Sequence, residues 1–339
     1  DSRKIKEGQW FIPLIGDNFN GHNFIKDSLK SKASNFLYSQ TDTISEKEKQ
    51  QGVWVSDCLK AYQLIASGWL KKLKNLKKIA LTGSVGKTTT KEILKSILSP
   101  HFKTIVTHKN HNNEIGVCQT LLALTETTEF LVLEMGARQK GDIKTLTEMV
   151  KPDLSLCLNA QKAHVGIFGS FEKLLETKAE IFTHAPKTAI LVAPKDQEKL
   201  YKKAVESEKT VISFGYDQES DLSIKDVNWL DSGEMNISFV WQKSKNFEVH
   251  SPLAHTSVPL NVAATFASLL ALGLKTEKLP KSLPRSILDS PGRFQKQTSH
   301  FGAQIIDDSY NASPSSMTEG LISIRKLFGK SKLVLILGD

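Results

Sequence analysis

The feature that most constrains the fold of this chain is a glycine-rich segment, TGSVGKTTT at residues 82–90, which separates a short apolar run from a helical pattern. A strand, such a loop and a helix in succession are the setting of a phosphate-binding loop, in which backbone N–H groups and the helix N-terminus face phosphate oxygens. We therefore predict an ATP site in which Lys87 neutralises phosphate charge and Thr88 reaches Mg²⁺. The predicted nucleotide-binding residues of the loop are Gly83, Ser84, Val85, Gly86, Lys87, Thr88 and Thr89.

Around this loop, short apolar runs alternate with helical patterns. Strands are expected at 79–81, 104–106, 130–133, 154–156 and 189–192, and helices at 87–98, 117–124, 143–149 and 171–182. Fully apolar strands separated by helices indicate an α/β fold with a parallel sheet covered by helices on both faces. The alternation at Ile237, Phe239 and Trp241 indicates antiparallel strands within 210–250, before a helix at 261–272.

The two ends of the chain have different patterns. Residues 1–57 indicate short strands and turns, followed by a helix at 58–73. A strand at 304–306 begins a further unit, and the apolar run 333–337 is expected to be a buried strand. Because the chain starts at Asp1 rather than at a methionine, we expect it to be a piece of a longer protein.

Composition narrows the choice of partners and compartment. Lysine and arginine (45) outnumber aspartate and glutamate (36), and the net charge of +9 favours anionic partners such as nucleic acid, acidic lipid or phosphorylated small molecules. The cysteines Cys58, Cys118 and Cys157 form no C-x-x-C pair, which argues against a disulfide framework or a cysteine zinc site and fits a reducing cytosol. No apolar run reaches the roughly 18 residues of a membrane span.

Chemically active side chains are expected at the carboxyl edge of the sheet, where parallel sheets bind ligands. Glu134 directly follows the predicted strand 130–133 and can hold Mg²⁺, which prefers oxygen ligands; a strand end in solvent is the alternative. His164 follows the next strand at the same edge. Lys178 lies in the predicted helix 171–182, where by itself it would be a surface lysine.

Together these motifs resemble the Mur ligases, the ATP-dependent amide-forming enzymes of peptidoglycan precursor synthesis. The resemblance runs along nearly the whole chain, and its segments are 1–3, 16–22, 82–90, 110–116, 159–164, 178–181 and 290–294. Two further segments, EMGA at 134–137 and DDSYNASPSSM at 307–317, resemble the last ligase of the series, which adds D-Ala-D-Ala to UDP-MurNAc-tripeptide.

The resemblance implies an architecture of three domains. Residues 1–75 would form a small α/β UDP-sugar-binding domain whose start is missing. Residues 76–298 would form the central P-loop ATPase domain, a parallel sheet covered by helices. Residues 299–339 would be the beginning of a Rossmann-like C-terminal domain.

The resemblance also implies roles for individual residues. Lys87, His164 and Lys178 would be catalytic, with Lys178 carbamylated, and the metal ligands would be Thr88, Glu134, His164 and Lys178. The other implied contacts are Ser2 and Arg3 near the uridine, Asn112 and Asn113 on substrate, Asn261 facing the adenine, and Arg293 and Asp308 on phosphate and ribose. Ahead of the adenine asparagine the family shows His-Asn, whereas this chain has Ser257-Val258.

The implied activity is an ATP- and Mg²⁺-dependent ligation through an acyl phosphate, by a cytoplasmic monomer that binds no nucleic acid. The side chain of the third peptide residue, diaminopimelate or lysine, is not indicated. The alternatives within the superfamily are the tripeptide-forming Mur ligase and a folylpolyglutamate synthase. A P-loop ATPase that depends on nucleic acid is an alternative of another class, supported by the net charge and by the lysine-rich run at 71–78, but the sequence shows no aromatic or basic-helix motif for nucleic acid.

Overall fold

The computed structural model describes residues 2–16, 18–41, 44–161, 168–288 and 291–338. The chain forms two compact units, Asp1–Leu73 with Leu121–Ala123, and Lys74–Thr120 with Leu124–Asp339. The division into three domains at residues 75 and 298 stays a prediction.

The smaller unit contains a three-stranded parallel sheet in the order β1 (Trp10–Phe11), β4 (Asn35–Tyr38), β5 (Gly52–Trp54). The expected short strands and the expected helix at 58–73 are confirmed by these strands and by α3 (Cys58–Lys72). Helix α3 begins after Asp57, whose carboxylate caps the N-terminus. The other elements of this unit are η1 (Ser2–Lys4), β2 (Ile15–Gly16), β3 (Phe19–Asn20), η2 (Gly21–Phe24), α1 (Ile25–Lys30) and α2 (Glu46–Lys49).

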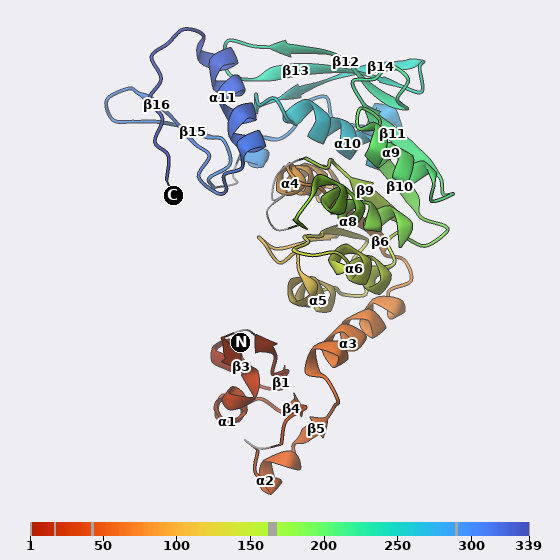
Figure 1. The fold of residues 1–339 in the computed structure, drawn as a ribbon, viewed down its shortest axis with the longest axis vertical. Coiled ribbons are helices and arrows are strands. Elements are labelled where there is room, and N and C mark those ends of the chain that lie inside the picture. Colours follow the sequence, from red (N-terminus) through yellow and green to blue (C-terminus); the bar gives the residue numbers. More distant parts are fainter. Residues whose placement is uncertain (1, 17, 42–43, 162–167, 289–290, 339) are drawn as a thin grey trace. The chain divides into compact units, whose positions relative to one another are not determined.

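The larger unit is built on a nine-stranded sheet in the order β14-β13-β12-β11-β10-β9-β6-β8-β7 (Figure 1). Pairing is parallel from β7 through to β12 and antiparallel between β12, β13 and β14. The strands are β6 (Lys77–Thr82), β7 (Thr104–Val106), β8 (Phe130–Glu134), β9 (Leu154–Cys157), β10 (Ile190–Pro194), β11 (Val211–Gly215), β12 (Leu222–Trp229), β13 (Met235–Trp241) and β14 (Lys245–Ser251).

One expectation within 210–250 is wrong. Strand β11 pairs in parallel with β10 and β12, although we expected this whole region to be antiparallel. The reason is a helix that the sequence pattern did not reveal, α9 (Glu198–Val205), which connects β10 to β11. A helical crossover brings the chain back in the same direction, so the strands on either side of it run parallel.

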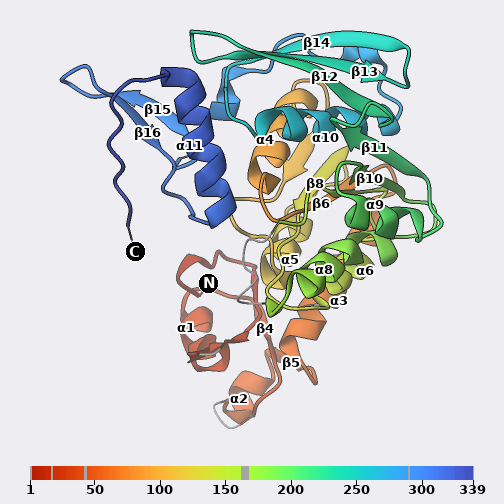
Figure 2. The same ribbon diagram turned by 45° about the horizontal axis from the view of Figure 1, so that its top comes forward.

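Helices cover both faces of the central strands. Figure 2 shows α4 (Lys87–Leu98) and α10 (Val258–Ala271) on one side of β6 and β8, and α6 (Asp142–Val150) and α8 (Phe171–Thr183) on the other. The predicted parallel sheet with helices on both faces is therefore confirmed. Helix α10 begins three residues earlier than expected, because Pro259 is accommodated in its first turn. The remaining helices here are α5 (Glu114–Leu122), η3 (Thr276–Lys278) and η4 (Arg285–Leu288).

The last part of the chain forms a two-stranded antiparallel ribbon, β15 (Gln295–Thr298) with β16 (Gln304–Asp307), followed by α11 (Pro314–Phe328). The sequence pattern did not reveal α11, although Ser313 forms a capping box at its start. The proposed boundary at residue 298 falls inside this ribbon. The expected strand at 333–337 is wrong: this run has no regular structure and Ile336 is 94% exposed. Apolar residues become a strand only beside a partner strand, and within the described residues none lies beside this run.

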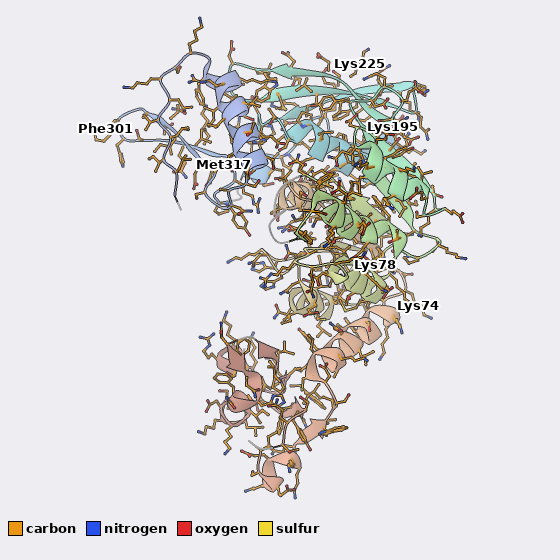
Figure 3. All side chains as sticks on the ribbon, viewed as in Figure 1. Lys74, Lys78, Lys195, Lys225, Phe301 and Met317 are labelled. Carbon is orange, nitrogen blue, oxygen red and sulfur yellow. The ribbon has the colours of Figure 1, made fainter. Side chains whose placement is uncertain are left out.

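The packing of α10 on the sheet predicts how one aromatic side chain contributes to stability. The Phe266 ring is fully buried, with its centroid 5.7 Å from that of Phe239 and 5.9 Å from that of Phe247. We expect Phe266→Ala to lower the free energy of unfolding by about 3–5 kcal/mol, measured by urea unfolding. Phe301, which is 98% exposed between β15 and β16 (Figure 3), is the control, and Phe301→Ala should change stability by less than about 0.5 kcal/mol. Equal losses in the two variants would contradict this account of the core.

Candidate active site

The glycine-rich loop lies where expected, between β6 and α4. Gly86 is the residue before α4 and has φ of 83°, a backbone conformation that glycine adopts at little cost. The amino group of Lys87 donates to the carbonyl oxygens of Gly83 and Ser84, at 2.8 and 3.2 Å. Burial lowers the pKa of Lys87, the positive charge of Arg293 lowers it further, and the carboxylate of Glu134 opposes both. A lysine bonded only to carbonyl oxygens has ammonium charge available for an anion.

Asn159, which follows β9, shows how the loop can hold an oxygen. The backbone N–H groups of Ser84 and Val85 both donate to the Oδ1 atom of Asn159, each at 3.1 Å. Its Nδ2 atom donates to the carbonyl oxygen of Val85, also at 3.1 Å. Because Asn159 occupies these two donors, the groups left for a nucleotide phosphate are the Lys87 ammonium and the N-terminus of α4, and these fit a phosphate.

Glu134 is the last residue of β8 and its carboxylate is almost fully buried, at 3% exposure. The Thr88 hydroxyl donates to its Oε2 atom at 3.1 Å, and Nδ2 of Asn112 donates to its Oε1 atom at 2.9 Å. Within the described residues, no cationic side chain lies at ion-pair distance from this carboxylate. A buried carboxylate without a paired cation is costly, and a Mg²⁺ held by one carboxylate, a hydroxyl and substrate phosphates would balance it.

Lys178 lies on the inner side of α8 and is 5% exposed, so it is not a surface lysine. Burial, and after it the positive charge of Lys87, lower the pKa of Lys178 to about 7, while the carboxylates of Glu134 and Asp142 oppose this. Much of the amine is therefore neutral near neutral pH. Lys178 is therefore near enough to Lys87 and Glu134 for their charges to influence its pKa.

Glu180, two residues after Lys178, fixes helix α8 against α6. The Glu180 carboxylate accepts hydrogen bonds from the backbone N–H groups of Gly141, at 2.8 Å, and Lys144, at 3.0 Å. These donors belong to the N-terminus of α6, where a negative charge is favourable. Glu180 thus ties α8, the helix that carries Lys178, to the N-terminus of α6.

A second group of predicted residues lies beside the loop. The Arg293 guanidinium stacks on the Tyr310 ring at 4.0 Å, and Asp308 accepts a hydrogen bond from the backbone N–H of Phe294 at 3.0 Å. Burial raises the pKa of Asp308. Asn261 is 3% exposed and packs its amide against Gly86, and its Nδ2 atom has no hydrogen-bond partner among the described residues. A buried, unpaired donor beside the loop is consistent with an acceptor supplied by a bound nucleotide.

Some predicted residues are not brought into this group. Ser2 and Arg3 belong to the smaller unit, in η1. The side-chain oxygen of Asn113 accepts the backbone N–H of Gly116 at 2.9 Å at the start of α5, so this part of the side chain is engaged within the chain. His164 lies outside the described residues. Conversely, the sequence analysis gave Asn159 no role of its own, although its position directly after an apolar strand was the available signal.

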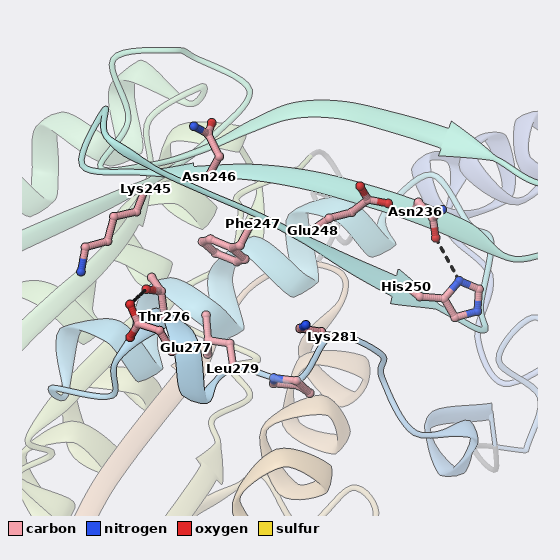
Figure 4. Close-up of a pocket in the computed structure, with 11 residues that line it drawn as sticks. Asn236, Lys245, Asn246, Phe247, Glu248, His250, Thr276, Glu277, Leu279 and Lys281 are labelled. Atoms are coloured by element: carbon pink, nitrogen blue, oxygen red, sulfur yellow. Dashed lines mark hydrogen bonds between the residues drawn. The ribbon is translucent and has the colours of Figure 1, made fainter.

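A separate cavity of about 700 Å³ lies between β14 and residues 276–281 (Figure 4). His250 and Asn236 meet there through a 3.0 Å hydrogen bond. Its lining carries both lysines and glutamates and none of the predicted site residues, so it is not part of the candidate site. In the part of the chain that the structure describes, no helix has the length and apolarity needed to cross a membrane.

Comparisons with known proteins agree with this geometry. Residues 81–269 match the family model of the Mur ligase middle domain. The chain is 32% identical to UDP-N-acetylmuramoyl-tripeptide–D-alanyl-D-alanine ligase of Bacillus subtilis, in a match that covers 100% of this chain and 72% of that protein.

Solved structures give the same result. The crystal structure of MurF from Acinetobacter baumannii has a TM-score of 0.84 and 28% identity, covering 98% of this chain and 70% of that one. The structure of MurF ligase from Thermotoga maritima in complex with ADP has a TM-score of 0.84 and 30% identity, covering 96% of this chain and 73% of that one.

The contact between Gly86 and Asn261 predicts a specific effect on nucleotide binding. A methyl group at position 86 would collide with the Asn261 amide and strain the positive φ, so we expect Gly86→Ala to weaken ADP binding about tenfold or more by calorimetry. Gly273, after α10, is the matched control, because it has φ of 93° and nothing within 4 Å of the added methyl. Gly273→Ala should cost some stability but leave ADP affinity unchanged, and parallel losses of affinity would refute the steric explanation.

Proposed function

The chain belongs to the Mur ligase family, and on this premise we propose that the site at the loop is where it joins D-Ala-D-Ala to UDP-MurNAc-tripeptide. The activity is that of an ATP-dependent ligase of peptidoglycan precursor synthesis. The observation that carries it is the similarity along the full length of this chain to relatives that bear the name of this ligase. The tripeptide carboxylate is activated as an acyl phosphate and is then taken by the amine of D-Ala-D-Ala.

We assign the phosphates to the Lys87 ammonium and to the N-terminus of α4, with Asn159 holding the N–H groups of Ser84 and Val85 and so the shape of the loop. Both ATP and the peptide carboxylate are anionic, so their approach requires positive charge that is already in place. Thr88 and Glu134 are the residues suited to hold Mg²⁺, which supplies charge neutralisation when it is bound. The contacts that support this assignment are those of the Lys87 ammonium, which bonds only carbonyl oxygens, and the buried Thr88–Glu134 pair.

The remaining assignments follow the family resemblance. We propose that residues 1–75, 76–298 and 299–339 belong to the UDP-sugar-binding, ATPase and C-terminal domains. We also propose that the protein acts as a cytoplasmic monomer and binds no nucleic acid. Its net charge of +9 suits the anionic UDP, ATP and peptide carboxylate. The further proposed contacts are His164 and Lys178 with metal, Thr89 and Asn261 with nucleotide, Arg293 and Asp308 with phosphate and ribose, and Ser2, Arg3, Asn112 and Asn113 with substrate.

The test of the function is phosphate release with UDP-MurNAc-tripeptide, with and without D-Ala-D-Ala, on the full-length protein. We expect phosphate release to require both substrates. A single amino acid, including glutamate, should not replace D-Ala-D-Ala. Lys87→Ala should reduce the rate at least about a hundredfold while its circular dichroism spectrum stays unchanged. Stimulation by a single amino acid would point to another ligase of the superfamily, and stimulation by DNA or RNA to a nucleic-acid-dependent ATPase.

We propose that Lys178 works as a carbamate. Its neutral amine attacks CO₂, a nitrogen–carbon bond forms and one proton leaves, so a cationic side chain becomes an anion with two oxygen donors for Mg²⁺. The pKa of about 7 and the burial beside Lys87 support this, because a second fixed ammonium next to Lys87 would repel the metal.

The carbamate predicts chemical rescue. Lys178→Ala should lose activity about a hundredfold or more, and acetate or formate should restore part of it by supplying the missing carboxylate. With ¹³C-labelled bicarbonate, the wild-type protein should show a carbamate carbon signal by NMR that Lys178→Ala lacks. Lys173→Ala, a change to an exposed lysine of the same helix, should retain the signal and the activity. Full activity of untreated Lys178→Ala would remove Lys178 from the mechanism.

A further inference from the structure

A buried lysine that is not among the predicted site residues lies on the same helix as Thr88. Lys91 is 1% exposed, although it carries an ammonium group at the end of a long, flexible side chain. Its Nζ atom donates to the backbone carbonyl of Thr107 at 2.9 Å, and Glu92 is 3.2 Å away. Burying an ammonium is costly, so the contact that it makes with Thr107 is the feature to explain.

Thr107 directly follows β7, is fully buried and joins that strand to the next one. Its backbone N–H donates to the carbonyl of Val132 at 3.0 Å. Its hydroxyl accepts the backbone N–H of Glu134 at 2.8 Å. Thr107 therefore holds the end of β8 by two hydrogen bonds. Its carbonyl makes a third hydrogen bond, to Lys91, which ties Thr107 to α4.

Helix α4 therefore reaches Glu134 by two routes. Thr88 in the first turn bonds the carboxylate itself, at 3.1 Å. Lys91, one turn further along, bonds Thr107, which fixes the backbone from which that carboxylate projects. Residues three apart on a helix lie on the same face, so both contacts come from one side of α4.

We propose that Lys91 is a positioning residue that sets, through Thr107, the direction of the Glu134 carboxylate and thereby the affinity of the site for Mg²⁺. This rests on the assignment of Mg²⁺ to Glu134 in the proposed function. Lys91 itself touches neither metal nor nucleotide. Its ammonium takes the place of water as the partner of the Thr107 carbonyl, so Thr107, which bonds the backbone of Glu134, is held from inside the fold.

The test compares two variants. Lys91→Met keeps the length of the side chain but removes its charge and its hydrogen-bond donors, whereas Lys91→Arg keeps the charge and the donors. Lys95→Met is the matched control, because Lys95 is one turn away, half exposed and pairs with the same Glu92 at 3.8 Å. Two quantities are measured on the full-length protein: the Mg²⁺ concentration that half-saturates the enhancement of ADP binding in calorimetry, and hydrogen exchange of peptides that contain Glu134.

We expect Lys91→Met to raise the half-saturating Mg²⁺ concentration about tenfold or more, since supporting partners of metal ligands have effects of this size. ADP affinity without metal should stay within about twofold, and the Glu134 peptide should exchange faster. Lys91→Arg should restore most of the wild-type Mg²⁺ affinity and most of the wild-type protection from exchange. Lys95→Met should behave as the wild type in both measurements. Thr107→Val, which removes only the hydroxyl acceptor, should reproduce the Mg²⁺ effect and serves as the test if Lys91→Met does not fold.

Two results would overturn the proposal in different ways. If Lys91→Met and Thr107→Val melt at lower temperature but keep the wild-type exchange at Glu134 and the wild-type Mg²⁺ dependence, Lys91 only stabilises the fold. If exchange at Glu134 rises while the Mg²⁺ dependence is unchanged, Glu134 is not the metal ligand, and the assignment in the proposed function fails with it. D-Ala-D-Ala-dependent phosphate release by the wild-type protein would remain a separate question, answered by its own assay.

Discussion

The parallel pairing of β6 with β8 on one side and β9 on the other is the constraint on which the site depends. In these ladders Leu81 lies beside Glu134, and Thr82 lies beside Cys157, so the three strands end at one level. The glycine-rich loop, the carboxylate and the amide of Asn159 then meet at one sheet edge, although they come from separate parts of the chain. Neither the loop nor the carboxylate has to be extended toward the other, because the register has already placed them together.

Within that frame, burial gives the site its electrostatic character. Glu134, Lys178 and Lys91 are all nearly excluded from solvent, and Lys87 is partly so. Burial lowers the pKa of both Lys87 and Lys178, and it raises the pKa of the Cys157 thiol to about 12, so this cysteine stays protonated. The low dielectric that makes these charges costly also strengthens their interaction with an anionic substrate. The apoprotein therefore holds charges that multiply charged ligands would compensate.

The sequence alone predicted the parts of this arrangement that have a local signal. Helix 87–98 and strand 104–106 were predicted with their bounds, because apolar periodicity and the glycine loop are local. The short, lysine-rich α9 was missed, and with it the parallel direction of β11. The run 333–337 was misjudged because apolar character does not reveal whether a partner strand exists. The signal for Asn159 was only its position after an apolar strand, and Lys91 had no local signal, since each acts through a backbone group far away in the sequence.

The packing of the glycine-rich loop has a consequence for how this segment can be exchanged between proteins. Residues 82–90 are held from outside by Asn159 after β9, by Asn261 of α10 and, through Glu134, by the segment around Thr107. The nine-residue motif therefore does not fix its own conformation. A chimera that received the motif without these three supports would have the sequence of a phosphate-binding loop but not its conformation. A chimera that received β6 to α10 as a whole would have both.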